Sequence, residues 1–242
     1  MKIVPFPVRQ TNLMHLVIGP NNSIILVDPI EPQKIKDYLQ NQNMPSDKVI
    51  VLTTHGHEDH NSGNLSLNHY FPEAQIFAGS ERSFAHSICQ PDQIIPLDHL
   101  TIQCIHIPGH TLDSFAFFLQ DHQTQQKILF PGDTLFYLGC GKIFEGTPTM
   151  MYHSLAKLTS LPPDTLIFYG HNYTEPNLRF RQHILNQDPP SNLPPTNLTI
   201  EQEKQYNLFL NPSLLSHHPD FTHLTPIQSL ARLRHLKDHF TA

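Results

Sequence analysis

Short apolar runs alternate with polar turns over the first 170 residues. The runs are rich in β-branched and aromatic residues, and Gly, Pro, Asp or Asn bounds each of them. This pattern is typical of β-strands separated by tight turns and loops. The predicted strands lie at residues 2–8, 13–19, 23–29, 48–54, 74–79, 100–107, 114–120, 127–133 and 165–170.

Apolar residues at helical spacing interrupt these strands at residues 31–42, 64–71 and 149–161. Pro32 suits the first turn of the first of these helices, where a missing N–H costs nothing. Strands mixed with helices predict a layered α/β or α+β domain.

The strand pattern stops at residue 172. Helical spacing takes over at residues 175–185, 199–210 and 225–240, and a Pro- and Asn-rich loop at 188–197 separates the first two helices. Such a segment is too small to fold alone. We therefore expect a main domain over residues 1–172 and a small helical appendage over residues 173–242.

Size and charge narrow the classes of function. The chain of 242 residues is long enough for an enzyme, and its formal charge of −6 without a basic run argues against nucleic-acid binding. The longest apolar runs fall far short of the roughly 20 residues of a membrane span, and the N-terminus lacks a signal peptide's apolar core. We expect a cytoplasmic monomer that binds neither nucleic acid nor membrane.

The three cysteines do not point to a metal or disulfide framework. Cys89, Cys104 and Cys140 are widely spaced and form no CxxC pair. They are interpreted as free thiols in a reducing compartment.

The segment "THGHEDH" at residues 54–60 carries the strongest chemical signal. It places His55, His57, Asp59 and His60 directly after an apolar run. Imidazoles and carboxylates at this density are unfavourable unless something binds them, and a metal cation is the obvious candidate. Because a catalytic zinc takes three protein ligands, four candidates in one segment predict two metals.

Three more candidates stand at the ends of apolar runs: His110 in "HIPGHT", Asp133 in "LFPGDT" and His171 in "IFYGH". A sheet aligns its strand ends along one edge, so residues distant in sequence can converge there. Alone, such a histidine is more often a surface residue than a ligand. Together with the dense segment, the set supplies five histidines and two aspartates, enough for two ions with one bridging carboxylate.

The motifs "THGHEDH", "PGHT", "GDTLF" and "GH", in this order, resemble those of the metallo-β-lactamase superfamily. The resemblance implies an α+β fold, an αββα sandwich with its metal site at one edge. The segments "GCGKIFEGT" (139–147), "GHNYT" (170–174) and "LRHLKDHF" (233–240) are similar to those of the narrower hydroxyacylglutathione hydrolase, or glyoxalase II, family. Together the motifs span nearly the whole chain.

The resemblance implies a division of the ligands. One metal is expected on His55, His57 and His110, the second on Asp59, His60 and His171, with Asp133 between the two. The expected cofactors are two divalent ions, zinc in the first place, with iron or manganese as alternatives because these ligand types discriminate little among them.

The resemblance also implies a reaction. S-(2-hydroxyacyl)glutathione, typically S-D-lactoylglutathione, would be hydrolysed to glutathione and a 2-hydroxy acid, D-lactate, in the second step of methylglyoxal detoxification. The expected nucleophile is a hydroxide bridging the two metals, supported by Asp59 and Asp133. No serine or cysteine nucleophile is needed, and Cys140 is interpreted as a packing residue.

Five further residues stand at positions where the family contacts its substrate, and four of them match the family's residues. The resemblance thus implies that the helical appendage over residues 173–242 is a substrate-binding domain. Lys142, Arg234 and Lys237 are expected to hold glutathione carboxylates, and Tyr173 to donate its hydroxyl. A helix over residues 226–239 would place Arg234 and Lys237 on one face. Phe144 stands where the family often has tyrosine, so a hydroxyl contact to glutathione is absent there.

Two other classes of function stay open from the sequence. One is a different hydrolase of the superfamily, such as a lactonase, or a persulfide dioxygenase, which typically uses one iron. The other is a metal-binding module without catalysis. The complete second set of Asp59, His60 and His171 favours the two-metal hydrolase.

Overall fold

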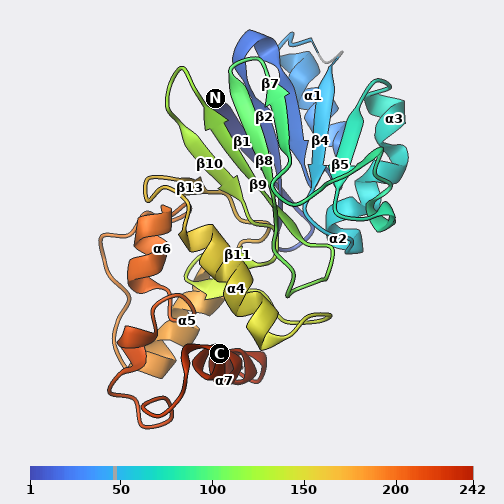
Figure 1. Ribbon diagram of the computed structural model, residues 1–242. Helices are drawn as coiled ribbons and strands as arrows, with labels where there is room; N and C mark the ends of the chain where they lie inside the picture. Colours follow the sequence, from blue (N-terminus) through green and yellow to red (C-terminus); the bar gives the residue numbers. More distant parts are fainter. Residues whose placement is uncertain (46–47, 242) are drawn as a thin grey trace.

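Two β-sheets form the centre of the computed structural model, which describes residues 1–45 and 48–241 (Figure 1). The first sheet has the strand order β1-β2-β3-β4-β5-β6. Strands β1 to β3 are antiparallel, and β3 to β6 run parallel. Their bounds are β1 Lys2–Val8, β2 Asn12–Ile18, β3 Ile24–Val27, β4 Val49–Thr53, β5 Gln75–Ala78 and β6 Ser87–Ile88.

The second sheet has the strand order β13-β10-β9-β8-β7 and is antiparallel except for the parallel pair β10 and β13. A separate two-stranded hairpin is formed by β11 and β12. The bounds are β7 Ile94–Leu97, β8 Leu100–His106, β9 Phe115–Asp121, β10 Lys127–Phe130, β11 Leu135–Phe136, β12 Gly139–Cys140 and β13 Leu166–Ile167.

Helices cover the outer faces of both sheets (Figure 1). The bounds are α1 Pro32–Asn41, α2 Glu58–Asn61, α3 Leu67–Tyr70, α4 Pro148–Thr159, α5 Thr174–Leu185, α6 Ile200–Tyr206 and α7 Pro226–Asp238. Single 3₁₀ turns lie at Pro20–Asn22, Ser62–Ser66, Glu81–Ser83 and Pro212–Leu215. The α+β class and the αββα sandwich predicted from the sequence are confirmed.

Three apolar clusters make the layers. Residues such as Leu52 and Phe117 fill the space between the two sheets, and Ile35 of α1 packs on the outer face of the first sheet. On the outer face of the second sheet, one continuous cluster joins Phe118 of β9 to residues of α4, α5, α6 and α7. The C-terminal helices thus share their core with the main body, and the boundary at residue 172 stays a prediction.

Local signals explain where several helices begin. Pro32 begins α1, and Thr225 caps α7 by accepting from the backbone N–H of Gln228, whose side chain accepts from the Thr225 N–H in return. The predicted helix at 64–71 is instead a 3₁₀ turn followed by the single turn α3. In the described part of the chain, we find no helix with the length and apolarity needed to span a bilayer.

The predicted strand at 165–170 is much shorter than expected. Only Leu166–Ile167 pair with β10, after which the chain turns away and His171 forms an isolated bridge with Asn12 of β2. The short strands β6, β7, β11 and β12 carry too few residues for an alternating pattern, and the sequence did not predict them. The turn after β13 matters because it brings His171 to the edge where β4 ends.

Candidate metal centre

The seven predicted ligands meet at one edge of the sandwich, in the segments that follow four strands, and two of them, Asp59 and His60, lie in the short helix α2. Strand β4 leads into the segment with four of them, and β8, β10 and β13 each lead to one more. All seven are buried or half-buried around the same volume, and His60 is only 1% exposed. The structure brings together all of the residues His55, His57, Asp59, His60, His110, Asp133 and His171.

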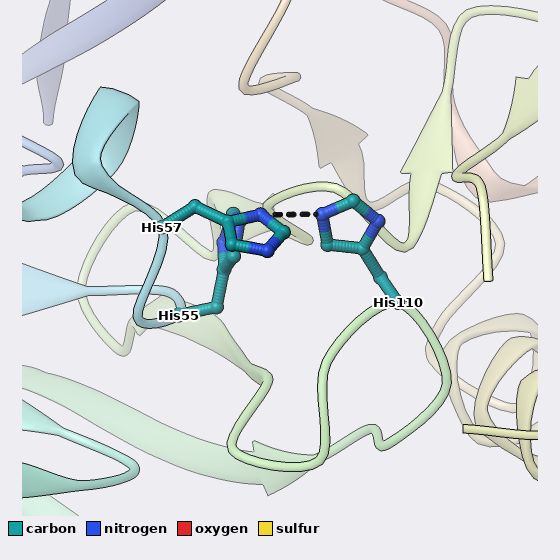
Figure 2. Close-up of side chains that lie close together, drawn as sticks. All are labelled: His55, His57 and His110. Carbon is teal, nitrogen blue, oxygen red and sulfur yellow. Dashed lines mark hydrogen bonds between the residues drawn. The ribbon is translucent and has the colours of Figure 1, made fainter. Parts of the chain in front are cut away.

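The first ligand group consists of His55, His57 and His110, whose rings turn toward one another (Figure 2). Nδ1 of His57 lies 3.0 Å from Nε2 of His55 and 3.0 Å from Nε2 of His110. Zinc–nitrogen bonds of about 2.0–2.1 Å in a tetrahedron separate neighbouring ligand atoms by about 3.3 Å. The spacing of the three nitrogens therefore fits one ion.

The second ligand group consists of Asp59, His60 and His171. The Nε2 atoms of the two imidazoles are 3.1 Å apart. Oδ2 of Asp59 lies 3.4 Å from Nε2 of His171 and 3.8 Å from Nε2 of His60. These separations again match the ligand spacing around one small divalent ion.

Asp133 lies between the two groups. Its Oδ2 is 3.5 Å from Nε2 of His110 in the first group and 3.4 Å from Nε2 of His171 in the second. Its Oδ1 is buried, 3.3 Å from Nε2 of His60, and accepts no hydrogen bond of normal geometry from the described residues. A buried carboxylate oxygen without a donor is unfavourable unless a cation compensates it, so the donor set fits two metals sharing Asp133.

The outer nitrogens of two ligand histidines face groups that can only accept a hydrogen bond at neutral pH. Nδ1 of His110 lies 2.8 Å from the carbonyl oxygen of Lys142, and Nδ1 of His60 lies 2.8 Å from Oδ2 of Asp28. Both Nδ1 atoms therefore carry the proton. Such partners fix the ring orientation and make the inner nitrogen a stronger ligand.

Thr54 orients His55 in a similar way. The Thr54 hydroxyl donates to Oδ2 of Asp28 at 2.8 Å, so its oxygen is left to accept from Nδ1 of His55 at 3.1 Å. Asp28 also accepts the Thr54 backbone N–H at 2.8 Å. One buried carboxylate thus supports two of the ligand histidines.

Polar residues at the β1–β2 turn complete the support. Oγ1 of Thr11 lies 2.9 Å from Nδ1 of His171, and Asn12 Nδ2 donates to Oδ2 of Asp59 at 3.0 Å. These two residues, together with Asp28 and Thr54, were not predicted from the sequence. The position of Asp28 directly after the apolar strand β3 was the one available signal.

The charges of the centre are those that cations require. Burial opposes ionisation of Asp133, but His60 and His171 outweigh it and hold the pKa of Asp133 well below its usual range. The hydrogen bond from His171 likewise lowers the pKa of Asp59. Burial lowers the pKa of His55 well below the ordinary value, so this ring is neutral. Anionic carboxylates and a neutral imidazole are the protonation states that bind metals.

His60 shows the converse effect. Its burial disfavours the charged ring, but Asp133 and Asp28 outweigh burial and raise the pKa of His60 well above the usual value. Without a metal, a proton therefore balances the two carboxylates. A divalent ion at the same place would displace that proton, which couples metal binding to pH.

Two of the predicted substrate residues lie at the mouth of the centre. Phe144 is 59% exposed, and its ring packs edge-on against His57 and His110 at centroid distances of 5.5 and 5.2 Å. The ammonium of Lys142 lies 5.3 Å from the centroid of the Phe144 ring. An apolar surface and a cation therefore adjoin the first ligand group.

Tyr173 adjoins the second ligand group, because its ring stacks on His171 with a centroid distance of 4.8 Å. It also lines an open hollow of about 470 Å³, together with Arg9, Thr11 and Asp59. This hollow gives solvent and small molecules access to the second ligand group.

Arg234 and Lys237 bind carbonyl groups of the protein itself. Arg234 is buried, and its Nη1 donates to the carbonyl oxygen of Cys140 at 2.6 Å. Lys237 is half-buried and donates to the carbonyl oxygen of Pro176 at 2.7 Å. The predicted helix is α7, and Lys237 borders a surface hollow of about 290 Å³. Their role in glutathione binding stays a prediction.

Cys140 is 3% exposed, and burial raises the pKa of its thiol to about 11 despite the nearby Arg234. A thiol in this state is not a nucleophile at neutral pH. The structure therefore favours the packing role predicted for this residue.

Solved structures share the fold over nearly the whole chain. ETHE1 from Myxococcus xanthus superposes with a TM-score of 0.66 at 22% identity, covering 98% of this chain and 97% of that one. TTHA1623 in a di-iron-bound form gives a TM-score of 0.56 at 24% identity (87% and 100% covered). The class B3 di-zinc metallo-β-lactamase LRA-12, from an Alaskan soil metagenome, gives 0.56 at 16% identity (94% and 87% covered). Fold and site define a protein of the metallo-β-lactamase fold with a histidine- and aspartate-rich centre.

Sequence relatives narrow the class. No protein-family model matches the chain. A probable hydroxyacylglutathione hydrolase of Schizosaccharomyces pombe is 33% identical, over 98% of both chains. A hydroxyacylglutathione hydrolase of Xylella fastidiosa is 35% identical, over 99% of this chain and 98% of its own length. The chain belongs to the hydroxyacylglutathione hydrolase family.

Proposed function

We propose that the chain hydrolyses S-(2-hydroxyacyl)glutathione thioesters, typically S-D-lactoylglutathione, and releases glutathione and a 2-hydroxy acid, D-lactate. Family membership supports the substrate class, since relatives of nearly equal length carry the name hydroxyacylglutathione hydrolase. The single observation that carries the chemistry is the pair of ligand groups joined by Asp133.

We propose two divalent cations as cofactors. His55, His57 and His110 would hold one, Asp59, His60 and His171 the other, and Asp133 would serve both. The spacing of the nitrogens supports this division, and zinc is the first choice, with iron or manganese as alternatives. When bound, such ions supply Lewis acidity, which polarises a carbonyl group and makes water acidic enough to deprotonate near neutral pH.

The protein's own groups hold the ligands in place for that chemistry. Asp28, Thr11 and the Lys142 carbonyl each face the outer nitrogen of a ligand histidine. Asn12 holds the Asp59 carboxylate through a hydrogen bond of 3.0 Å. Because these partners are themselves fixed by backbone or buried side chains, the centre is preorganised before substrate arrives.

The reaction needs little acid catalysis from the chain. The thiol of glutathione is of the cysteine type, with an ordinary pKa of about 8.5, so its thiolate leaves without prior protonation. No histidine outside the set of seven proposed metal ligands has to act as a proton donor in this reaction. The residues at the mouth are therefore free to serve binding.

We propose that glutathione binds along the side of the centre formed by Lys142, Phe144 and Tyr173, continuing toward Lys237 and Arg234. Lys142 provides an exposed cation for a carboxylate, and the exposed ring of Phe144 provides an apolar wall for the thioester sulfur and its methylene. The acyl group would point to the hollow beside Asp59 and His171. We further propose action in a reducing compartment, the cytoplasm, which fits three buried cysteines that form no disulfide.

Loss of thioester absorbance is the direct test. Metal-replete protein is incubated with S-D-lactoylglutathione, and glutathione release is counted with a thiol reagent. Oxygen consumption with glutathione persulfide serves as the control for the dioxygenase alternative. Stoichiometric release of glutathione without oxygen uptake is the expected result. Oxygen uptake with the persulfide, and no hydrolysis of the thioester, would overturn the proposed function.

A further inference from the structure

The β11–β12 hairpin connects two parts of the metal centre. It begins two residues after Asp133 and ends two residues before Lys142, whose carbonyl oxygen orients His110. The two arms are tied at their base, where the Gly141 N–H donates to the Thr134 carbonyl at 3.2 Å. A Cβ atom at Gly141 would overlap the Asp133 carbonyl, so the arms touch there without free space. A shift of the hairpin therefore moves the site.

Three buried side chains from the C-terminal helical region form hydrogen bonds with the backbone at the tip of this hairpin, residues 137–139. Glu203 of α6 accepts the Leu138 N–H at 2.9 Å. Asn207 donates to the Gly139 carbonyl at 3.1 Å, and Asn177 of α5 donates to the Tyr137 carbonyl at 2.9 Å. Three backbone groups, two in the peptide unit 137–138 and one in the unit 139–140, are thus held by side chains distant in the sequence.

The tip needs such support because its backbone is strained. Leu138 has a φ of 49°, in the left-handed region that residues with a branched side chain avoid. A conformation of this kind persists only where the surroundings hold it. The contact from Glu203 to the Leu138 N–H acts at that residue itself.

Glu203 also contacts the segment after β13, which carries His171 of the second ligand group. It is 0% exposed and accepts from the hydroxyl of Tyr169, two residues before His171, at 2.7 Å. Its other oxygen accepts from Asn207 Nδ2 at 2.7 Å. In the described part of the chain, no cation lies within ion-pair distance of this carboxyl group.

A buried carboxyl group with three donors and no cation is a poor source of stability, because an apolar side chain of similar size avoids the cost of desolvation. It is, however, a strict geometrical constraint. It fixes the Leu138 N–H, the Tyr169 hydroxyl and the Asn207 amide at the same time.

We propose that Glu203 is a positioning residue of the metal centre, which acts through the β11–β12 hairpin on the Lys142 carbonyl and thereby on His110. The helical region then has a second task besides binding substrate. The inference rests on the ligand assignment of the proposed function, but not on which substrate is hydrolysed.

The test uses Glu203→Gln in the full chain. In either orientation, the NH₂ of the new amide faces another donor, which is Asn207 Nδ2 in one orientation and the Leu138 N–H in the other. The hydrogen bonds that hold the hairpin tip are therefore disrupted. The matched control is Glu201→Gln on the exposed side of the same helix. The first readout is the Nδ1–H resonance of His110 in metal-free protein, whose exchange with water should become faster in Glu203→Gln and not in the control.

The second readout is metal affinity, measured by competition with a chromophoric chelator. Loss of an outer-shell partner weakens metal binding about 10- to 100-fold in other sites, and a decrease in this range is expected for Glu203→Gln. With saturating metal, kcat should fall equally for lactoylglutathione and for a small thioester without the tripeptide, while KM stays near wild type. A purely structural role would lower the melting temperature and leave the exchange of the His110 proton, the metal affinity and kcat unchanged.

Asn177→Ala provides a second variant in case Glu203→Gln does not fold, because it removes one tip contact and adds no misplaced donor. It should shift the same readouts in the same direction, by less. Wild-type exchange of the His110 proton and wild-type metal affinity in a folded variant would overturn the proposal. If wild type fails to hydrolyse lactoylglutathione while Glu203→Gln weakens metal binding, the positioning role stands and the proposed function falls.

Discussion

Nδ1 of His60 lies 2.8 Å from Oδ2 of Asp28, with both side chains buried. This contact sets the inner nitrogen of His60 as the metal-facing atom. Asp28→Asn keeps the shape of the side chain but offers a neutral and weaker acceptor. We expect metal affinity to fall about 10- to 100-fold, as for outer-shell partners of other sites. Chelator competition measures the change, and Asp37→Asn on the exposed face of α1 is the matched control.

A bridging role for Asp133 predicts loss of both ions from one substitution. Asp133→Ala removes a carboxylate that lies within 3.5 Å of both His110 in one ligand group and His171 in the other. Elemental analysis of protein purified without chelators should approach two metals per chain for wild type and fewer than one for the variant. A variant that keeps both metals at wild-type affinity would contradict the bridge.

Cys140 should not take part in the chemistry. Its thiol is buried with a pKa of about 11, so the thiolate is scarce at neutral pH. Cys140→Ala should keep most of the turnover, whereas a strong chelator should abolish turnover in wild type and variant alike. Mass spectrometry after a quench with substrate gives an independent check, because a stable acyl adduct on Cys140 would contradict this expectation.

Lys237 should contribute to substrate binding and not to carbonyl attack. A charge-assisted hydrogen bond contributes roughly 1.5–3 kcal/mol, so Lys237→Ala should raise KM for lactoylglutathione about ten-fold or more with little change in kcat. A small thioester without glutathione never makes this contact and should be unaffected. Equal impairment with both thioesters would show that Lys237 does not bind glutathione.

The same lysine predicts a pH dependence. Burial lowers the pKa of Lys237 from 10.5 to about 8. The ammonium is present below this pKa and lost above it, so KM for lactoylglutathione should rise as the pH passes through about 8. Lys237→Ala should remove that rise in KM, which distinguishes the titration of Lys237 from the titration of other groups.

Glu203 predicts an unusual dependence of stability on pH. Burial raises its pKa from 4.5 to about 7, with Tyr137 and Tyr169 as the titratable neighbours and no cation against it. Between these values the folded chain holds a proton that the unfolded chain has released. The free energy of unfolding should therefore fall by about 3 kcal/mol as the pH rises from 4.5 to 7.

Urea unfolding of wild type and Glu203→Gln at pH 5 and pH 7.5 measures this effect as a difference of differences. The variant should lose less stability than wild type over this interval, because Gln does not titrate. Parallel pH profiles for the two proteins would show that Glu203 does not release its proton in this range.

The seven metal-ligand candidates were predictable because each directly follows an apolar run, and strand ends meet along one edge. Asp28 obeys the same rule, but in "LVDP" it resembles an ordinary turn aspartate. Its task depends on His60 and Thr54, 32 and 26 residues away. Local pattern carries no information about such partners.

The helical region shows more clearly what the local sequence pattern cannot predict. Glu203 lies in "TIEQEK", a segment for which the sequence predicts only a helix, and the structure buries it against the hairpin tip. Arg234 was predicted to bind a glutathione carboxylate, and the structure adds a partner that the sequence did not indicate, the Cys140 carbonyl. In both cases the deciding partner is a backbone group of β11–β12, and those two-residue strands leave no periodic signal.

The seven ligand candidates are spread from residue 55 to residue 171. An unfolded chain would have to close long loops to bring His110, Asp133 and His171 to the segment at 55–60, so ions bind the complete centre of the folded chain more tightly. Any ion that binds the native centre then adds to the free energy of unfolding by mass action, about 4 kcal/mol at a thousand times its dissociation constant. The free metal concentration around the protein therefore governs its lifetime against proteases and heat, and starvation for metal would reduce the amount of protein as well as its turnover.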